Sequence, residues 1–502
     1  MTYKIEYIAD DTLPSLGWLA IVDLGKKTLR IIHGRYVECR NDWLVEGIWD
    51  GDFQEGNFHK TEIFFGSGIR KDNEKIYFVT SCALTDRILY CKDQNWLIIS
   101  NSLLLLLGFT DAKLDGRYDY RSEAVSVLIN GINGYERKFR VLHPRIKNFY
   151  QVFYENIIFK DGQIHFEMKP RENLVIKSFE AYYRLLIETL KRLKHNFDSK
   201  QREIPIRPFT TISSGYDSTA VSALVKEIGV KECFSGNRLD GLLLRSRDDN
   251  GKIVAEKLGY LVNELDTKRS SISEDELYFL ATNYPKFSNS VWSEISLHSM
   301  VKTVEGLNQT AIIFTGYRGD SMWNVHLNKK YQAGDLKGHG AISGLNLSEI
   351  RLKTGFFTAA LPYLFYHHIK DIVAISNSKE MEAWKLGNNY DRPIARRIVE
   401  EAGIDRHLFG INKRHITTTY LWPINKKNQS AFFRYLKKEM QIGKWYVMAY
   451  YLQNRVLVNK FRMKKLFGKN IDFYDLMRKW ATHVLAKKYS ALLDNYKNLY
   501  HE

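Results

Sequence analysis

The chain has 502 residues, 44% of them hydrophobic, which is enough to form the buried cores of two or three domains. Its four cysteines form no paired CxxC spacing and its longest apolar run, 103–107, is too short to cross a bilayer, so we expect no disulfide framework, zinc site or transmembrane segment, and a cytoplasmic setting. The formal net charge of +17 favours an anionic substrate or partner.

Residues 1–170 are expected to form a β-rich domain. Short apolar or alternating segments lie there between Gly, Asp and Asn turns, as at 18–22, 29–32, 75–79 and 96–99. This pattern is typical of short strands joined by turns.

One stretch of this half resembles glutamine amidotransferase domains of the N-terminal-nucleophile type. Residues 85–90 and 95–102 are similar to the Asp-x-x-Gly-x-x-x-Leu-Tyr-Tyr and Phe-x-Ser-Ser patterns of those domains. The resemblance implies an α+β sandwich like that of the N-terminal-nucleophile hydrolases. Active members use an N-terminal cysteine whose own amino group is the base, but position 2 here is Thr2 and the first cysteine is Cys39. We therefore expect a degenerate domain that releases no ammonia from glutamine; the alternative is that Thr2, freed from Met1, is a nucleophile.

Residues 175–502 are expected to form a second, α/β domain. Strand-like segments alternate there with long helical stretches such as 177–196. A parallel sheet with crossover helices requires this alternation.

The most informative segment of the second domain is 209–219, where a β-prone run breaks into small residues and opens a helix. Backbone amides can approach an anion closely at three of its positions, Ser213, Ser214 and Gly215. Ser218 can cap the helix and donate to a phosphate, and Asp217 can hold a magnesium ion. The Gly-Lys-Ser/Thr ending of a Walker loop is missing, so we predict another type of nucleotide-binding loop.

This loop resembles the Ser-Gly-Gly-x-Asp-Ser pyrophosphate loop (PP-loop) of the ATP pyrophosphatases, with Ser214 at the first glycine. A second strand and glycine turn follows at 310–321, with Thr315 and Gly316 leading to Tyr317 and Asp320. In the asparagine-synthetase-like branch the corresponding run is Ser-Gly-Glu-Gly-x-Asp-Glu, and its aspartate joins the loop aspartate on magnesium. In β-lactam and carbapenam synthetases a tyrosine replaces the glutamate, as Tyr317 does here. Arg318 replaces a glycine of the family and puts the local backbone path in question.

A third similarity lies at 390–403 and 408–414, which resemble the late part of the synthetase domain. There an arginine-bearing helix is followed by a turn and by a lysine near the reacting phosphate, and Lys413 matches that lysine. The three motifs follow the order of the asparagine synthetase-like PP-loop amide synthetases, and they are nearest to β-lactam and carbapenam synthetases and lasso-peptide cyclases. The resemblance implies a parallel sheet like that of the adenine-nucleotide α-hydrolases.

The resemblance also implies a ligase reaction that uses ATP and Mg²⁺. The phosphates would lie on the two loops, at Ser213, Ser214, Gly215, Ser218, Thr315 and Gly316. Magnesium would be held by Asp217 and Asp320 while a substrate carboxylate attacks the α-phosphorus, which gives an acyl adenylate and pyrophosphate. Lys413 would stabilise the charge that develops on the phosphoryl oxygens. An amine then attacks the adenylate, and Tyr317 would take its proton, with Glu349 as the candidate assisting carboxylate.

Two other functions stay open. One is a PP-loop enzyme that modifies tRNA, which the basic charge favours and the amidotransferase-like half opposes. The other is a non-catalytic nucleotide-binding homologue, suggested by three departures from the synthetase pattern: Ser214, Arg318 and Phe356. We expect the substrates to be a small-molecule, peptide or sugar-acid carboxylate and an amine, and we expect no nucleic acid partner.

Three further features of the second domain bear on metal binding, local structure and substrate charge. His367 and His368 are adjacent and would point to different faces, so we expect no shared metal there. Asp248 and Asp249 are expected to begin a helix. Residues 411–502, expected to be mainly helical, carry 19 Lys and Arg against 5 Asp and Glu, which favours an anionic or carrier-borne substrate, a polyanion, an acidic membrane surface or only a solvated helical face.

Overall fold

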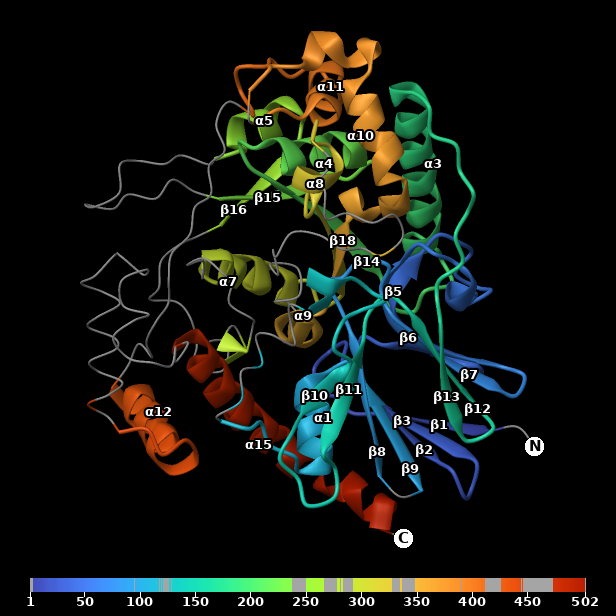
Figure 1. Ribbon diagram of the computed structural model, residues 1–502, viewed down its shortest axis with the longest axis vertical. Coiled ribbons are helices and arrows are strands. Elements are labelled where there is room, and N and C mark those ends of the chain that lie inside the picture. Colours follow the sequence, from blue (N-terminus) through green and yellow to red (C-terminus); the bar gives the residue numbers. More distant parts are fainter. Residues whose placement is uncertain are drawn as a thin grey trace.

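The computed structural model describes residues 3–93, 95–116, 118, 120, 126–127, 129–236, 250–265, 278–279, 281–282, 292–326, 335, 348–388, 390–410, 426–443, 445 and 473–501. These residues form a β-rich unit, drawn in blue to cyan, and an α/β unit, drawn in green to orange (Figure 1). The final helix, drawn in red, lies beside the first unit.

Two sheets make up the first unit. One has the order β1-β3-β2-β9-β8-β11-β10. Its strands are β1 (Lys4–Ala9), β2 (Trp18–Asp23), β3 (Thr28–His33), β8 (Ile88–Asp93), β9 (Trp96–Ser100), β10 (Lys138–Arg140) and β11 (Asn148–Val152). All neighbours in it are antiparallel except β1 and β3.

The other sheet is antiparallel and has the order β13-β12-β7-β6-β5-β4. Its strands are β4 (Glu38–Arg40), β5 (Trp43–Trp49), β6 (Phe64–Asp72), β7 (Lys75–Val79), β12 (Asn156–Lys160) and β13 (Gln163–Glu167). The short helix η1 (Phe58–Lys60) lies between β5 and β6.

Alternation along the strands decides which residues fill the core between the sheets. Trp18 and Ala20 of β2 are buried there together with Ile69 of β6 and Phe78 of β7. The residues between them on β2 point the other way, where α1 (Leu103–Thr110) covers the sheet. The C-terminal helix α15 (Phe473–His501) then packs along α1, so the end of the chain returns to the first unit (Figure 1).

The second unit is built on a five-stranded, all-parallel sheet with the order β16-β15-β14-β17-β18. Its strands are β14 (Ile206–Ile212), β15 (Glu232–Gly236), β16 (Leu261–Leu265), β17 (Thr310–Thr315) and β18 (Phe356–Ala360). The sequence predicted a β-rich first part and a second part with a parallel sheet and helices. Both predictions are confirmed.

Helices precede, connect and follow the strands of the parallel sheet. They are α3 (Phe179–Phe197), α4 (Tyr216–Lys226), α5 (Lys252–Lys257), α7 (Trp292–Glu305), α8 (Gly319–Met322), α9 (Ser348–Thr354), α10 (Ile369–Asn377), α11 (Pro393–Glu401) and α12 (Lys426–Glu439), with the short turns η4 (Leu361–Tyr363), η5 (Tyr366–His368) and η6 (Lys379–Trp384). In Figure 1, α4 and α11 lie above the sheet and α7 lies below it. Helix α4 packs on β14 and β17, and α11 packs on α4.

The two units meet through buried charges. Arg351 of α9 lies 2.6 Å from the carboxylate of Glu46 on β5 and 2.8 Å from that of Asp86. All three side chains are almost completely buried. Removing one partner from such a group leaves an uncompensated buried charge, so these contacts fix how the units fit together.

The predicted boundary between the domains, 170–175, falls in an irregular stretch between β13 and α3. Helix α3 begins after Ser178, whose hydroxyl accepts a hydrogen bond from the N–H of Ala181. Within the described part of the chain, no helix is both long and apolar enough to span a membrane.

Candidate active site at the ends of β14 and β17

The loop after β14 is held in shape by its own hydroxyl groups. The N–H of Ser213 donates to Oγ of Ser218 at 3.1 Å, and the two serine hydroxyls lie 2.8 Å apart. Thr219 Oγ1 donates to the carbonyls of Ser213 and Gly215. The result is a tight turn that directs the first N–H groups of α4 toward the end of the sheet, an arrangement suited to an anion.

One expectation about this loop was wrong. Ser218 was expected to cap α4, but the helix begins after Gly215 and Ser218 lies in its first turn. Its hydroxyl turns back to Ser213 instead. The N-cap is therefore a glycine, whose lack of a side chain leaves the helix terminus to be satisfied by other groups.

The second predicted motif lies directly beside the first. Strands β14 and β17 pair in parallel, with Phe209 opposite Ile313, so both chains leave the sheet at the same edge. A Cβ atom at Gly316 would lie 2.5 Å from the backbone of Asp217, and one at Gly319 would lie 2.6 Å from Asp217 Cγ. Only glycine fits at these two places, and the fit holds Asp217 against the second loop.

Asp320 follows Gly319 in the first turn of α8, so the structure brings the two predicted metal ligands to the same end of the sheet. A cation of the protein itself also lies there. Arg392 forms an ion pair with Asp217 Oδ2, and both side chains are largely buried. Burial alone would lower the pKa of Arg392, but the nearby carboxylates of Asp217 and Asp320 outweigh burial and raise it.

The predicted third motif covers the loop. The N–H of Gly410 donates to the carbonyl of Ser214 at 2.8 Å. Gly410 has a φ of +62°, and a Cβ atom there would meet the ring of Tyr216 at 2.3 Å. Arg396 of α11 donates to the hydroxyl of Tyr216. Lys413 itself lies outside the described residues, three positions after Gly410, and its role stays a prediction.

Tyr390 lies over the start of α4. Its ring packs against that of Tyr216 with centroids 4.9 Å apart, and the guanidinium of Arg392 lies 4.9 Å from the centroid of the Tyr390 ring. Its hydroxyl faces Gly215 and the N–H of Tyr216. Burial raises the pKa of Tyr390 to about 12, so the hydroxyl keeps its proton at neutral pH.

Tyr317 lies at the end of β17 in an aromatic stack. Its ring is 5.8 Å from that of Tyr363, which is in turn 5.8 Å from that of Tyr366. The next residue, Arg318, has a φ of +74° and its guanidinium lies 6.0 Å from the ring of Tyr363. This left-handed backbone conformation favours glycine, the residue that the resemblance led us to expect here, and Arg318 adopts it.

Glu349, the predicted partner of Tyr317, makes its side-chain hydrogen bonds to the first unit. Its carboxylate accepts hydrogen bonds from the Ser102 hydroxyl at 2.7 Å and from the Leu103 N–H at 2.8 Å, and so caps α1 of the first unit. Burial raises the pKa of Glu349, although these hydrogen bonds oppose the rise. These contacts place Glu349 at the junction between the two units.

The remaining predicted features lie elsewhere. His367 pairs with Glu62 at 2.8 Å and His368 with Asp371 at 3.4 Å, so the two imidazoles face different carboxylates. Phe356 is buried in β18. Thr2, Asp248 and Asp249 lie outside the described residues.

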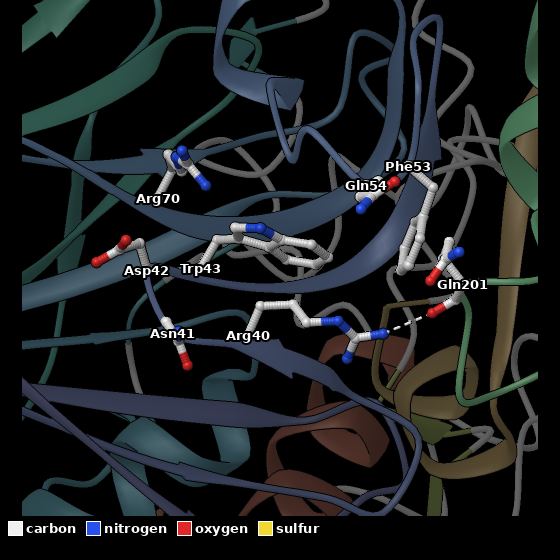
Figure 2. A pocket seen from close by; sticks show the side chains of 8 residues that line it. All are labelled: Arg40, Asn41, Asp42, Trp43, Phe53, Gln54, Arg70 and Gln201. Carbon is white, nitrogen blue, oxygen red and sulfur yellow. Dashed lines mark hydrogen bonds between the residues drawn. The ribbon is translucent and has the colours of Figure 1, made fainter.

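A cavity of about 310 Å³ lies away from this site, beside the β4–β5 turn of the first unit (Figure 2). It is lined by Arg40, Asn41, Asp42, Trp43, Phe53, Gln54, Arg70 and Gln201. Arg40 donates to the carbonyl of Gln201 at 2.7 Å and to the carboxylate of Glu203 at 2.9 Å. These contacts hold the segment before β14 against the first unit.

Sequence reasoning assigned no role to Tyr390 or Arg392, although both lie in a segment that it singled out. The sequence signal that could have found them is Pro393, because a proline often occupies the first position of a helix. Tyr390 and Arg392 therefore lie at the start of α11.

A comparison of the sequence with models of known protein families finds no match, and no curated protein matches it either. The assignment of a function therefore depends on the resemblance of the motifs and on the geometry of the loops around Asp217.

Proposed function

We propose that this protein is an ATP-dependent ligase that forms a carbon–nitrogen amide bond. A carboxylate substrate is activated as an acyl adenylate with release of pyrophosphate, and an amine then attacks the adenylate. The observation that carries the proposal is the contact of the two strand-end loops at Asp217, which leaves room only for glycine at Gly316 and Gly319. We further propose that the second unit has an adenine-nucleotide α-hydrolase-like fold and the first an N-terminal-nucleophile-hydrolase-like fold.

The residues at the loop fit a magnesium–nucleotide pair. Mg²⁺ is commonly bound by one or two carboxylates together with substrate phosphates, and Asp217 and Asp320 supply two carboxylates on adjacent loops. The ion pair of Asp217 with Arg392 demonstrates that this carboxylate accepts a cation. The metal would neutralise charge on the phosphates, and the N–H groups of α4 would bind their oxygens.

Tyr317 is the proposed proton acceptor in amide formation. It follows the glycine turn beside Asp217, and its stacking on Tyr363 fixes the ring. A general base at this position would act on the amine after adenylation, and Lys413 would assist the earlier step.

We propose that the amine does not come from a cysteine-dependent glutaminase in this chain. Burial raises the pKa of each of the four cysteines, and that of Cys39 to about 12. The nearest candidate for a catalytic pair, Cys39 with His33 at 3.4 Å, therefore stays a thiol at neutral pH. Free ammonia, a second substrate or an amine of the acyl substrate itself would serve instead.

ATP–pyrophosphate exchange tests the proposal. Purified protein is incubated with ATP, Mg²⁺, labelled pyrophosphate and a panel of sugar acids, amino acids and peptides, and exchange that requires one acid class supports adenylation. Nucleotide binding without exchange across the panel would indicate the non-catalytic alternative. Exchange that requires tRNA would indicate the nucleic-acid-modifying alternative.

A further inference from the structure

We propose that Arg392 is a movable cation of the nucleotide site, which pairs with Asp217 when no metal is bound and transfers to a phosphate oxygen when the metal–nucleotide complex arrives. This inference rests on the proposed function, because it assumes that Asp217 is a metal ligand. It assigns a binding residue that the motif resemblance left without a role.

The position of Arg392 is fixed by its neighbours on both sides. It is the N-cap residue of α11 and directly precedes Pro393, the first residue of that helix. Its guanidinium lies over the ring of Tyr390, which is itself packed on Tyr216. The side chain is 5% exposed, so the guanidinium is confined to the space around Asp217 and the start of α4.

The same space must hold the phosphates. Asp217 is in the first turn of α4, and the hydroxyl of Tyr390 marks the position of the first N–H groups of that helix. A guanidinium has the donor geometry for a phosphate as well as for a carboxylate. A short rotation of the side chain would therefore exchange one anionic partner for another.

The two cations compete for one carboxylate. The single negative charge of Asp217 cannot fully neutralise both Arg392 and Mg²⁺ at the same time. Asp320 also attracts Arg392 electrostatically. A metal ion that binds alone must displace Arg392 from Asp217 and leaves the guanidinium without an anionic partner. A metal ion that binds with the nucleotide brings a phosphate, which is a new anionic partner for Arg392. Arg392 thus weakens binding of the metal alone and strengthens binding of the complex.

Opposite changes in two affinities test the inference. Binding of Mn²⁺ alone is measured from the paramagnetic resonance signal of free Mn²⁺, and binding of α,β-methylene-ATP with Mg²⁺ by calorimetry. Arg392→Gln is expected to bind Mn²⁺ at least about tenfold more tightly and the nucleotide at least about tenfold more weakly. Adding Asp217→Asn should remove the gain in Mn²⁺ binding.

Matched variants separate this role from a structural one. Arg184→Gln, at an exposed residue paired with Glu180, should change neither affinity. Tyr390→Phe keeps the ring under Arg392 and should leave Mn²⁺ binding unchanged, whereas Tyr390→Ala should raise it. Arg392→Lys keeps the charge and serves as the second variant if Arg392→Gln does not fold. Its affinities for Mn²⁺ and for the nucleotide should lie between those of wild type and of the glutamine variant.

The outcomes that overturn the inference differ from those that overturn the function. If Arg392→Gln weakens both affinities or changes neither, Arg392 is a structural residue, even if pyrophosphate exchange is intact. If the two affinities change in opposite directions but no acid supports exchange, Arg392 has the proposed role and the ligase assignment fails.

Discussion

At the scale of single residues, Asp217 has the most contacts that bear on chemistry. It touches both glycines of the second loop and pairs with Arg392, so a change of its charge affects metal, nucleotide and arginine together. The sequence predicted its role from the loop motif. It could not predict Arg392, because nothing in a local pattern shows which distant carboxylate an arginine will meet.

Replacement of the acid pair tests the metal site. Asp217→Asn and Asp320→Asn should each abolish pyrophosphate exchange while thermal unfolding stays close to wild type. The double variant should be no worse than either single one, because both residues serve one ion. Exposed Asp371→Asn is the control, and near wild-type exchange in either single variant would contradict the assignment.

Tyr317→Phe removes only a hydroxyl and keeps the stack on Tyr363. Exchange should be almost unchanged, because adenylation precedes the proton transfer. Amide formation should fall by roughly two to four orders of magnitude, the usual contribution of a positioned general base. Both rates are measured in the same preparation, and a parallel fall in both would indicate that Tyr317 shapes the ATP site.

Glu349→Gln tests the junction role by its pH dependence. Burial raises the pKa of Glu349, so the folded protein holds this proton more tightly than the unfolded chain. The stability contributed by the protonated group is complete below the usual glutamate pKa and is lost as pH rises through the raised pKa of the folded state. A glutamine side chain can still accept a hydrogen bond from the Leu103 N–H and donate one to the Ser102 hydroxyl. It does not ionise, so its contribution to stability does not fall as pH rises.

The free energy of unfolding of Glu349→Gln, relative to wild type, should therefore rise as pH increases from the usual glutamate range toward neutrality. Urea denaturation across this range measures it. Amide formation by the variant should equal that of wild type. A selective loss of amide formation, with no change in stability, would return Glu349 to the catalytic site.

At the scale of elements, local sequence patterns predicted the strands and helices whose formation depends on neighbouring residues. The strand before Ser213 and the helix after it follow from β-prone and small residues, and the structure has both. The helix cap was mispredicted because a serine three residues into a helix and a serine at its cap look alike in sequence. The adjacency of the two loops was predicted only through the resemblance, since the strands that carry them are about a hundred residues apart.

Gly319→Ala tests the contact between the loops. A Cβ atom 2.6 Å from Asp217 Cγ must push the aspartate or the loop aside, so exchange should fall at least about tenfold with little loss of sheet stability. Gly306→Ala, whose Cβ atom would have ordinary contacts, is the control. Unchanged exchange in Gly319→Ala would mean that the loops need not touch.

At the scale of the whole molecule, the two units are joined by contacts between residues far apart in the chain. Arg351 and Glu46 are 305 positions apart, and Glu349 and Ser102 are 247 apart. No composition shift or motif pairs such residues, so the sequence predicted two domains but not their junction. The return of α15 to α1 was equally invisible, because the apolar residues of α15 fit any partner surface.

The crossing of α1 and α15 yields the last prediction. A Cβ atom at Gly108 would lie 2.9 Å from the backbone N of Ser490 and 3.0 Å from the carbonyl carbon of Tyr489. Gly108→Val should therefore separate the helices and lower the free energy of unfolding by about 1–3 kcal/mol. Because α15 carries exposed Lys487 and Lys488, it should also become sensitive to trypsin.

Nucleotide binding should survive in Gly108→Val, since the described neighbours of Gly108 at this crossing belong to α15, whereas the loops lie at the end of the parallel sheet. Gly443→Ala, where a Cβ atom meets no described atom within 4 Å, is the matched control for digestion and unfolding. Simultaneous loss of nucleotide binding would show that the C-terminal helix supports the nucleotide site through the junction. Unchanged trypsin resistance and stability would show that the helices tolerate the added side chain and that this crossing is not tightly fixed.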